Sequence, residues 1–135
     1  MLAIKVLHLL TNLIRMEKKI IPLPPTTGPK FFRQYLELLN PIIHLRGKEL
    51  DVLAELLYHN HSLKSIPEEH RWKLIFDYDT KLKIRNKLKL SEASMNNNLS
   101  GLRKKKIIQD NRIAKAYMVE PGKEFLLGFK FVIDE

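Results

Sequence analysis

The sequence predicts a mainly helical α+β domain, and three observations lead to this prediction. The chain has 135 residues, of which 44% are hydrophobic, and this suits one compact globular domain. Between residues 30 and 105, apolar residues recur at steps of three and four, which is the spacing of amphipathic helices. After residue 106 the pattern changes to short apolar segments separated by turn residues, which is typical of β-strands.

Five helices are expected in residues 30–105. The first covers residues 30–39 and ends before Asn40 and Pro41, because proline lacks a backbone donor. The second covers residues 48–59, and a polar break is expected at its end, over residues 59–62. The continuous apolar stripe of this second helix consists of Leu50, Leu53, Ala54 and Leu57.

The other three helices have recognisable starts or spacings. Pro67 opens a short helix, and helices over residues 79–89 and 91–105 follow it. Asp77 to Thr80 supply capping residues before the helix at 79–89, and Ser91 is the expected N-cap of the last helix. The apolar residues that these helices carry at helical spacing include Trp72, Phe76, Met95, Leu99 and Leu102.

A β-hairpin and a terminal strand are expected at the end of the chain. Residues 107–119 predict a strand, a tight turn and a strand, because Asp110 and Asn111 tolerate the left-handed backbone of a hairpin turn. A second turn follows at residues 121–122, and alternation over residues 124–134 predicts a terminal strand.

The first 29 residues predict an N-terminal segment and an arm. Residues 1–14 are apolar at helical spacing, and they lack the basic start and the small-residue cleavage site of a signal peptide. Residues 22–29 hold four of the seven prolines, which predicts an extended arm. The sequence leaves open whether translation starts at Met1 or at Met16.

Composition excludes several classes of site. The chain has no Cys, which excludes disulfides, iron–sulfur clusters and thiolate metal sites, and which fits a reducing compartment. No transmembrane helix is expected, because no run of about 18 apolar residues is free of charge.

The net charge is +9, and residues 61–119 hold 14 basic and 6 acidic residues. Such an excess attracts polyanions, although a solvated helical face has the same composition.

No enzyme is predicted. The sequence lacks a set of residues with the spacing of a metal site, so no metal and no cofactor are expected. The nearest candidates are His59 and His61, combined with His70, Asp77 or Asp79. A glycine-rich phosphate loop and a nucleophile elbow are both absent from the sequence. These absences favour a binding protein.

The order of the expected elements resembles a winged helix-turn-helix DNA-binding domain. In that order, three helices over residues 48–59, 79–89 and 91–105 are followed by a hairpin at 107–119. Residues 49–57 read Glu-Leu-Asp-Val-Leu-Ala-Glu-Leu-Leu, and the helix at 91–105 runs into the hairpin with Leu-Arg-Lys-Lys-Lys-Ile-Ile. These two segments look like the first core helix and the end of the recognition helix of the multiple-antibiotic-resistance-regulator type, which the chain resembles within residues 48–119. It implies a single winged-helix domain over residues 30–135, with its core at 48–119. Where such regulators have long dimerising helices, this chain has a proline-rich arm and the expected terminal strand.

The resemblance also implies a DNA interface. In this fold the helix at residues 91–105 enters the major groove, where Asn pairs with adenine and Ser with several bases. The implied base contacts are Ser94, Asn96, Asn97 and Ser100. The implied phosphate contacts are Lys87, Lys89, Arg103, Lys104, Lys105, Arg112 and Lys115. An unpartnered polar and basic surface is the alternative interpretation of the same residues.

Two functions are therefore expected from the sequence. The first is binding of double-stranded DNA by the helix at 91–105 and the wing at 107–119, as a transcription regulator or replication-associated protein in the cytoplasm of a bacterial or phage-infected cell. The alternative is a structural or adaptor subunit of a larger assembly, such as a phage virion. That subunit would contact copies of itself or neighbouring subunits through residues 1–29 and the terminal strand. The DNA sequence and the oligomeric state stay open.

Overall fold

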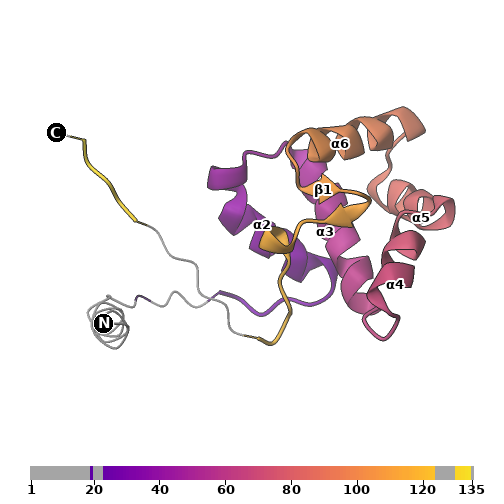
Figure 1. Ribbon diagram of the computed structural model, residues 1–135, viewed down its shortest axis with the longest axis horizontal. Coiled ribbons are helices and arrows are strands. Elements are labelled where there is room, and N and C mark those ends of the chain that lie inside the picture. The colour runs from indigo at the N-terminus through magenta and orange to yellow at the C-terminus, as the bar shows by residue number, and fades with distance from the viewer. Residues whose placement is uncertain (1–18, 20–22, 124–129, 135) are drawn as a thin grey trace, which may run out of the picture.

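The protein is a mainly helical α+β structure, as the sequence predicts. The computed structural model describes Lys19, residues 23–123 and residues 130–134 (Figure 1). The elements of these residues are, in order, α2 (Pro29–Ile43), α3 (Gly47–Ser62), α4 (Glu68–Ile75), α5 (Tyr78–Leu88), α6 (Glu92–Lys104), β1 (Ile108–Gln109), β2 (Arg112–Ile113) and the 3-10 helix η1 (Lys115–Tyr117).

Helix α3 is the centre of the core. It contacts α2, α4, α5 and α6, and in Figure 1 it runs between α2 on one side and α4 and α5 on the other. The predicted apolar stripe of α3 is buried, and Val52 and Leu56 are buried beside it. Burial on so many sides explains why this helix is apolar over most of its circumference.

Helix α2 is longer than the sequence predicts, because it continues through Pro41 to Ile43. Pro41 is exposed, and the Asn40 side chain closes the end of the helix by accepting from the Leu45 backbone N–H at 2.7 Å. The prediction that the helix ends before Asn40 is therefore wrong, since a side chain satisfies the backbone beyond it.

The expected polar break at residues 59–62 is also helical, so that prediction is wrong. These residues form the last turn of α3, and Asn60 is buried there. Arg71 of α4 satisfies Asn60, because its Nη1 donates to Asn60 Oδ1 at 3.0 Å. The same guanidinium donates through Nε to the backbone oxygen of Ile66 at 3.1 Å, which fixes the α3–α4 connection.

The starts of α5 and α6 confirm the predicted helices. Asp77 caps α5 by accepting from the Thr80 N–H at 2.8 Å, and Ser91 caps α6 by accepting from the Ser94 N–H at 3.0 Å. The expected core edge of α6, formed by Met95, Leu99 and Leu102, is buried against the rest of the protein. Trp72 of α4 is buried as well, while Phe76 is half-buried.

The hairpin turn is confirmed, but its second strand is much shorter than expected. Ile108 pairs with Ile113 across a turn in which Asp110 and Asn111 both have φ of 52°. After Ile113 the chain forms η1 in place of a strand to residue 119. The Tyr35 hydroxyl of α2 donates to the Tyr117 backbone oxygen at 3.2 Å, so this segment folds onto α2 instead of extending the hairpin.

The expected terminal strand is not formed by residues 130–134, which have no regular structure, and residues 124–129 lie outside the described part. The helix expected in residues 1–14 also lies outside it. Residues 23–28 of the arm have no helix or strand, and Pro29 is the first residue of α2. Among the described helices, none has the length and apolar content needed to cross a membrane.

Candidate nucleic-acid interface

The outward face of α6 carries most of the predicted base-contacting residues. Asn96, Asn97 and Ser100 are exposed, on the side of the helix away from the buried Met95 and Leu99. This arrangement follows from the helical period, because positions one, two and five residues after Met95 point away from the core. The three side chains offer amide and hydroxyl groups to solvent.

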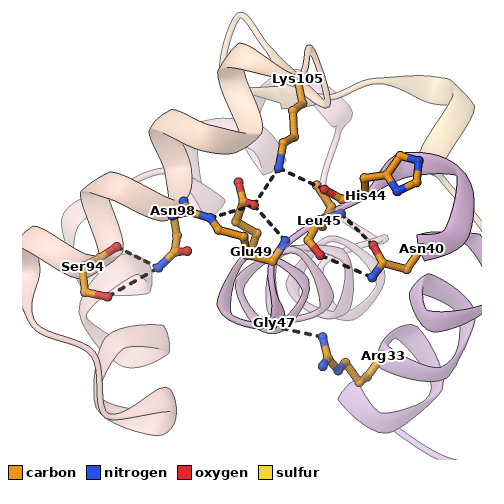
Figure 2. Close-up of polar contacts among 10 residues, drawn as sticks. Arg33, Asn40, His44, Leu45, Gly47, Glu49, Ser94, Asn98 and Lys105 are labelled. Atoms are coloured by element: carbon orange, nitrogen blue, oxygen red, sulfur yellow. Dashed lines mark hydrogen bonds and ion pairs between the residues drawn. The ribbon is translucent and has the colours of Figure 1, made fainter.

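Ser94 and Asn98 lie on the flank of α6 that turns toward the core. Asn98 is buried, and its Nδ2 donates to the Ser94 backbone oxygen at 2.8 Å (Figure 2). Ser94 is half-buried and lies at the edge of the outward face. The run of three Asn residues therefore divides into two exposed residues and one that stabilises the helix internally.

Five of the seven predicted phosphate contacts have cationic groups without a partner among the described residues. All five are exposed, and none makes a side-chain hydrogen bond or ion pair within the described part of the chain. They are Lys89, Arg103, Lys104, Arg112 and Lys115.

Lys105 is different, because it joins α6 to a buried carboxylate. Its Nζ lies 2.8 Å from Glu49 Oε1 of α3 and donates to the backbone oxygen of His44 at 3.2 Å (Figure 2). Glu49 Oε1 also accepts from the backbone N–H and the Nε of Arg46, at 3.0 and 3.1 Å. Lys105 thus holds together the C-terminal end of α6, the start of α3 and the end of α2.

The Glu49 carboxylate is fully buried and charged. Burial by itself raises its pKa, but hydrogen bonds from Lys105 and from the backbone and side chain of Arg46 outweigh that effect, so the pKa lies below its ordinary value. The second carboxylate oxygen lies against Gly101 of α6. Any Cβ at position 101 would collide with it, so only glycine lets α3 and α6 approach this closely.

Lys87 also pairs with a buried carboxylate. Its Nζ lies 2.7 Å from Glu55 Oε1 of α3, whose side chain is only 6% exposed. The ammonium is 5.9 Å from the centre of the Tyr58 ring, a distance at which a cation and an aromatic ring attract each other. Lys87 therefore stabilises the α3–α5 contact, in addition to any role on the surface.

The hairpin turn lies beside α4. Arg112, Asp110 and Asn111 line a groove together with Glu69 and Trp72 of α4. The structure thus places Arg112 at the border of α4, while Arg103 and Lys104 lie at the end of α6. The groove at the hairpin turn contains the acids Glu69 and Asp110 as well as the cations Lys73 and Arg112, so it has no net positive charge.

Arg46 and Lys48, at the start of α3, are two cations that the sequence analysis did not select. Both line a groove beside Ser94 and Asn97 of α6. In the sequence they appear only as basic residues around a glycine, with no motif to mark them. Only the fold places them next to α6.

No group of three or more His, Asp or Glu side chains in the described part of the chain is arranged to hold a metal ion. His59 is half-buried, and its pKa is lowered first by burial and then by Lys83 and Lys87, while Glu55 opposes this shift. His59 is therefore an uncharged group of the α3–α5 contact at neutral pH.

Comparison of the chain with models of protein families, with curated proteins and with solved structures finds no match.

Proposed function

We propose that this protein binds double-stranded DNA, with α6 in the major groove and the hairpin beside it, in the manner of a winged helix-turn-helix domain. The observation that carries the proposal is the outward face of α6. It combines Asn96, Asn97 and Ser100 with the cations Arg103 and Lys104, and the structure gives none of these side chains a partner within the described residues. The order of α3, α5, α6 and the hairpin supports the same function.

The dimensions and chemistry of α6 suit the major groove. A helix with its side chains is about 10–12 Å wide, and the major groove is about 12 Å wide. Asn96 and Asn97 can each offer an amide to adenine, and Ser100 can donate to or accept from several bases. Arg103 and Lys104 lie at the C-terminal end of α6, where they can contact phosphates or, for Arg103, guanine.

A salt series with two double variants tests this proposal. Binding of random duplex DNA should weaken steeply with salt, because each phosphate contact releases counterions. The variant Arg103→Gln/Lys104→Gln should reduce the slope of log affinity against log salt by about two, since two contacts are lost. The matched control is Lys30→Gln/Lys64→Gln, which removes the same charge from exposed residues of α2 and of the loop after α3.

Absence of duplex binding at low salt would contradict the proposal. An equal slope change in the two double variants would contradict the placement of the DNA on α6. If binding is found, selection of preferred sequences with Asn96→Ala/Asn97→Ala should show relaxed preference at one or two positions, by about 1–3 kcal/mol each. We propose transcription control or replication in a bacterial or phage-infected cell as the process that such binding serves.

A specific observation favours a second function, that of an adaptor in a larger assembly such as a phage particle. Phe131, Val132 and Ile133 are 93%, 74% and 84% exposed, in a segment without regular structure. Three consecutive apolar residues in water can be covered when an extended segment adds to a sheet edge of another protein.

Light scattering on the full chain and on a chain ending at residue 129 tests this function. A defined oligomer that the truncation dissociates would favour the adaptor, and a monomer in both cases would contradict self-assembly through this segment.

A further inference from the structure

A groove between the start of α3 and the length of α6 contains cations that belong to neither the predicted base contacts nor the predicted phosphate contacts. Its two adjoining parts both include Arg46 and Asn97. One part reaches Lys48 and Ser94, and the other reaches Lys104. We call this feature the α3–α6 groove. A molecule that touches Asn97 on α6 therefore lies next to the cations of α3.

The charges in the α3–α6 groove are positive in sum, and its acids are already neutralised by partners. Four cations line the groove, and its two carboxylates leave an excess of two positive charges. Asp51 lies 3.4 Å from Arg33, outside the groove, and Glu49 is paired with Arg46 and Lys105. The four cations are Arg46, Lys48, Lys104 and Lys105.

Lys48, like Lys104, is open to a ligand. It is exposed, and its ammonium makes no hydrogen bond or ion pair within the described residues. Arg46 has a side chain that is 66% exposed even though its Nε is bound to Glu49. Arg46 lines both parts of the groove. Both residues can therefore neutralise an anion without breaking a contact that the fold needs.

The geometry of a duplex indicates that this anion is a phosphate of the DNA backbone. A helix that fills the major groove has a phosphate chain along each of its flanks, because the groove is only about as wide as the helix. The start of α3 lies directly against one flank of α6, where the Glu49 carboxylate touches Gly101 and Lys105. A duplex seated on α6 thus brings one phosphate chain to Arg46 and Lys48.

We propose that Arg46 and Lys48 form a second phosphodiester-binding site, at the start of α3, which holds one strand of the duplex while α6 occupies the major groove. This inference rests on the proposed function. It extends the interface from one helix to two, and it assigns to α3 a role in the position of the DNA on the protein. Phosphate contacts of this kind fix the register of a protein on a duplex without reading its sequence.

The test uses Lys48→Gln, because Arg46 also holds Glu49 and its replacement would disturb the core. Lys64→Gln is the matched control. Lys64 is exposed just beyond the other end of α3, about 24 Å from Lys48 along a helix of 16 residues. Duplex binding is measured for both variants and for the natural chain between 50 and 300 mM salt, with thermal unfolding as a check on folding.

Lys48→Gln should lower the slope of log affinity against log salt by about 0.9 and weaken binding by roughly five- to tenfold at about 0.1 M salt. Lys64→Gln should change neither. Lys48→Arg should restore the slope, since it restores the positive charge. The relative preference among DNA sequences should stay the same in Lys48→Gln, because a phosphate contact carries no base information.

The outcomes separate the inference from the function on which it rests. A natural chain that binds duplex DNA with a steep salt slope, together with a Lys48→Gln variant that matches Lys64→Gln, would overturn the second site and leave the proposed function standing. A natural chain that does not bind duplex DNA would overturn both. A Lys48→Gln variant that changes the sequence preference would also overturn the assignment, since it would place Lys48 at a base edge.

Discussion

Adjacent residues of the same type have different roles at the end of α6. Lys104 is exposed and has no partner within the described residues, whereas Lys105 is tied to the buried Glu49 carboxylate at 2.8 Å. The sequence presents both in one basic run and gives no reason to separate them. The contact partner of Lys105 lies 56 positions earlier in the chain, so no local pattern could reveal it.

Replacing each of these two lysines by methionine should separate stability from binding. Lys105→Met removes a charged donor from a buried carboxylate, so the free energy of unfolding should fall by about 1–3 kcal/mol. Lys104→Met should change it by less than about 0.5 kcal/mol. Urea unfolding measures both. Equal stability of the two variants would show that the Lys105–Glu49 pair adds nothing to the fold.

The sign of the stability change caused by Gly101→Ala tests whether position 101 lies against the Glu49 carboxylate. In an ordinary helix, Gly→Ala stabilises the protein by up to about 1 kcal/mol. Here Gly101→Ala should destabilise it by about 1–3 kcal/mol, because the new methyl group would collide with the Glu49 carboxylate. Ser100→Ala, on the exposed face, is the control and should be nearly neutral. In a Glu49→Ala background the penalty at position 101 should disappear, and its persistence there would contradict the collision.

Elements that depend on local signals were predicted well, and elements that depend on distant partners were not. The starts of α5 and α6 follow from Asp77 and Ser91, which cap their own helices, and the buried edge of α6 follows from its spacing. The extension of α2 depends on the Asn40 side chain reaching Leu45, and the last turn of α3 depends on Arg71 of another helix. The short second strand depends on Tyr35, which lies 82 positions before Tyr117. Spacing along the sequence contains no information about such pairs.

One part of the candidate site could be predicted from the sequence, and the other part could not. The exposed face of α6 could be predicted, because the helical period fixes which residues oppose the buried edge. The pairing of Lys87 and Lys105 with carboxylates of α3, and the place of Arg46 and Lys48 beside α6, required the packing of one helix on another.

The hairpin turn is an element whose stability can be raised. Asp110 and Asn111 both have φ of 52°, a backbone region that costs a side chain free energy but that glycine adopts readily. Asn111→Gly should therefore stabilise the protein by about 0.5–1 kcal/mol, as measured by thermal or urea unfolding. Asn111→Ala is the matched variant and should destabilise it by about 1 kcal/mol. Loss of stability in both variants would contradict the turn geometry.

The stability of the whole molecule should depend on acid through Glu49. The pKa of this carboxyl in the folded protein lies below its ordinary value of 4.5. The stability that the ionised group contributes is therefore fully present above pH 4.5, and it is lost as the pH falls through the lowered pKa. Unfolding free energies between pH 7 and pH 3 should decline more steeply for the natural chain than for Glu49→Gln. Parallel curves would show that Glu49 does not titrate differently in the folded and unfolded chains.

The position of α3 among four other helices has a consequence for how the protein opens. No surrounding helix can detach without exposing apolar side chains of α3 to water, so partial opening is costly at every side. The amide protons in the middle of α3 should then exchange with solvent only when the entire helical body unfolds. Their exchange rates would report the global free energy of unfolding, and the folded part would lose its structure in a single cooperative transition.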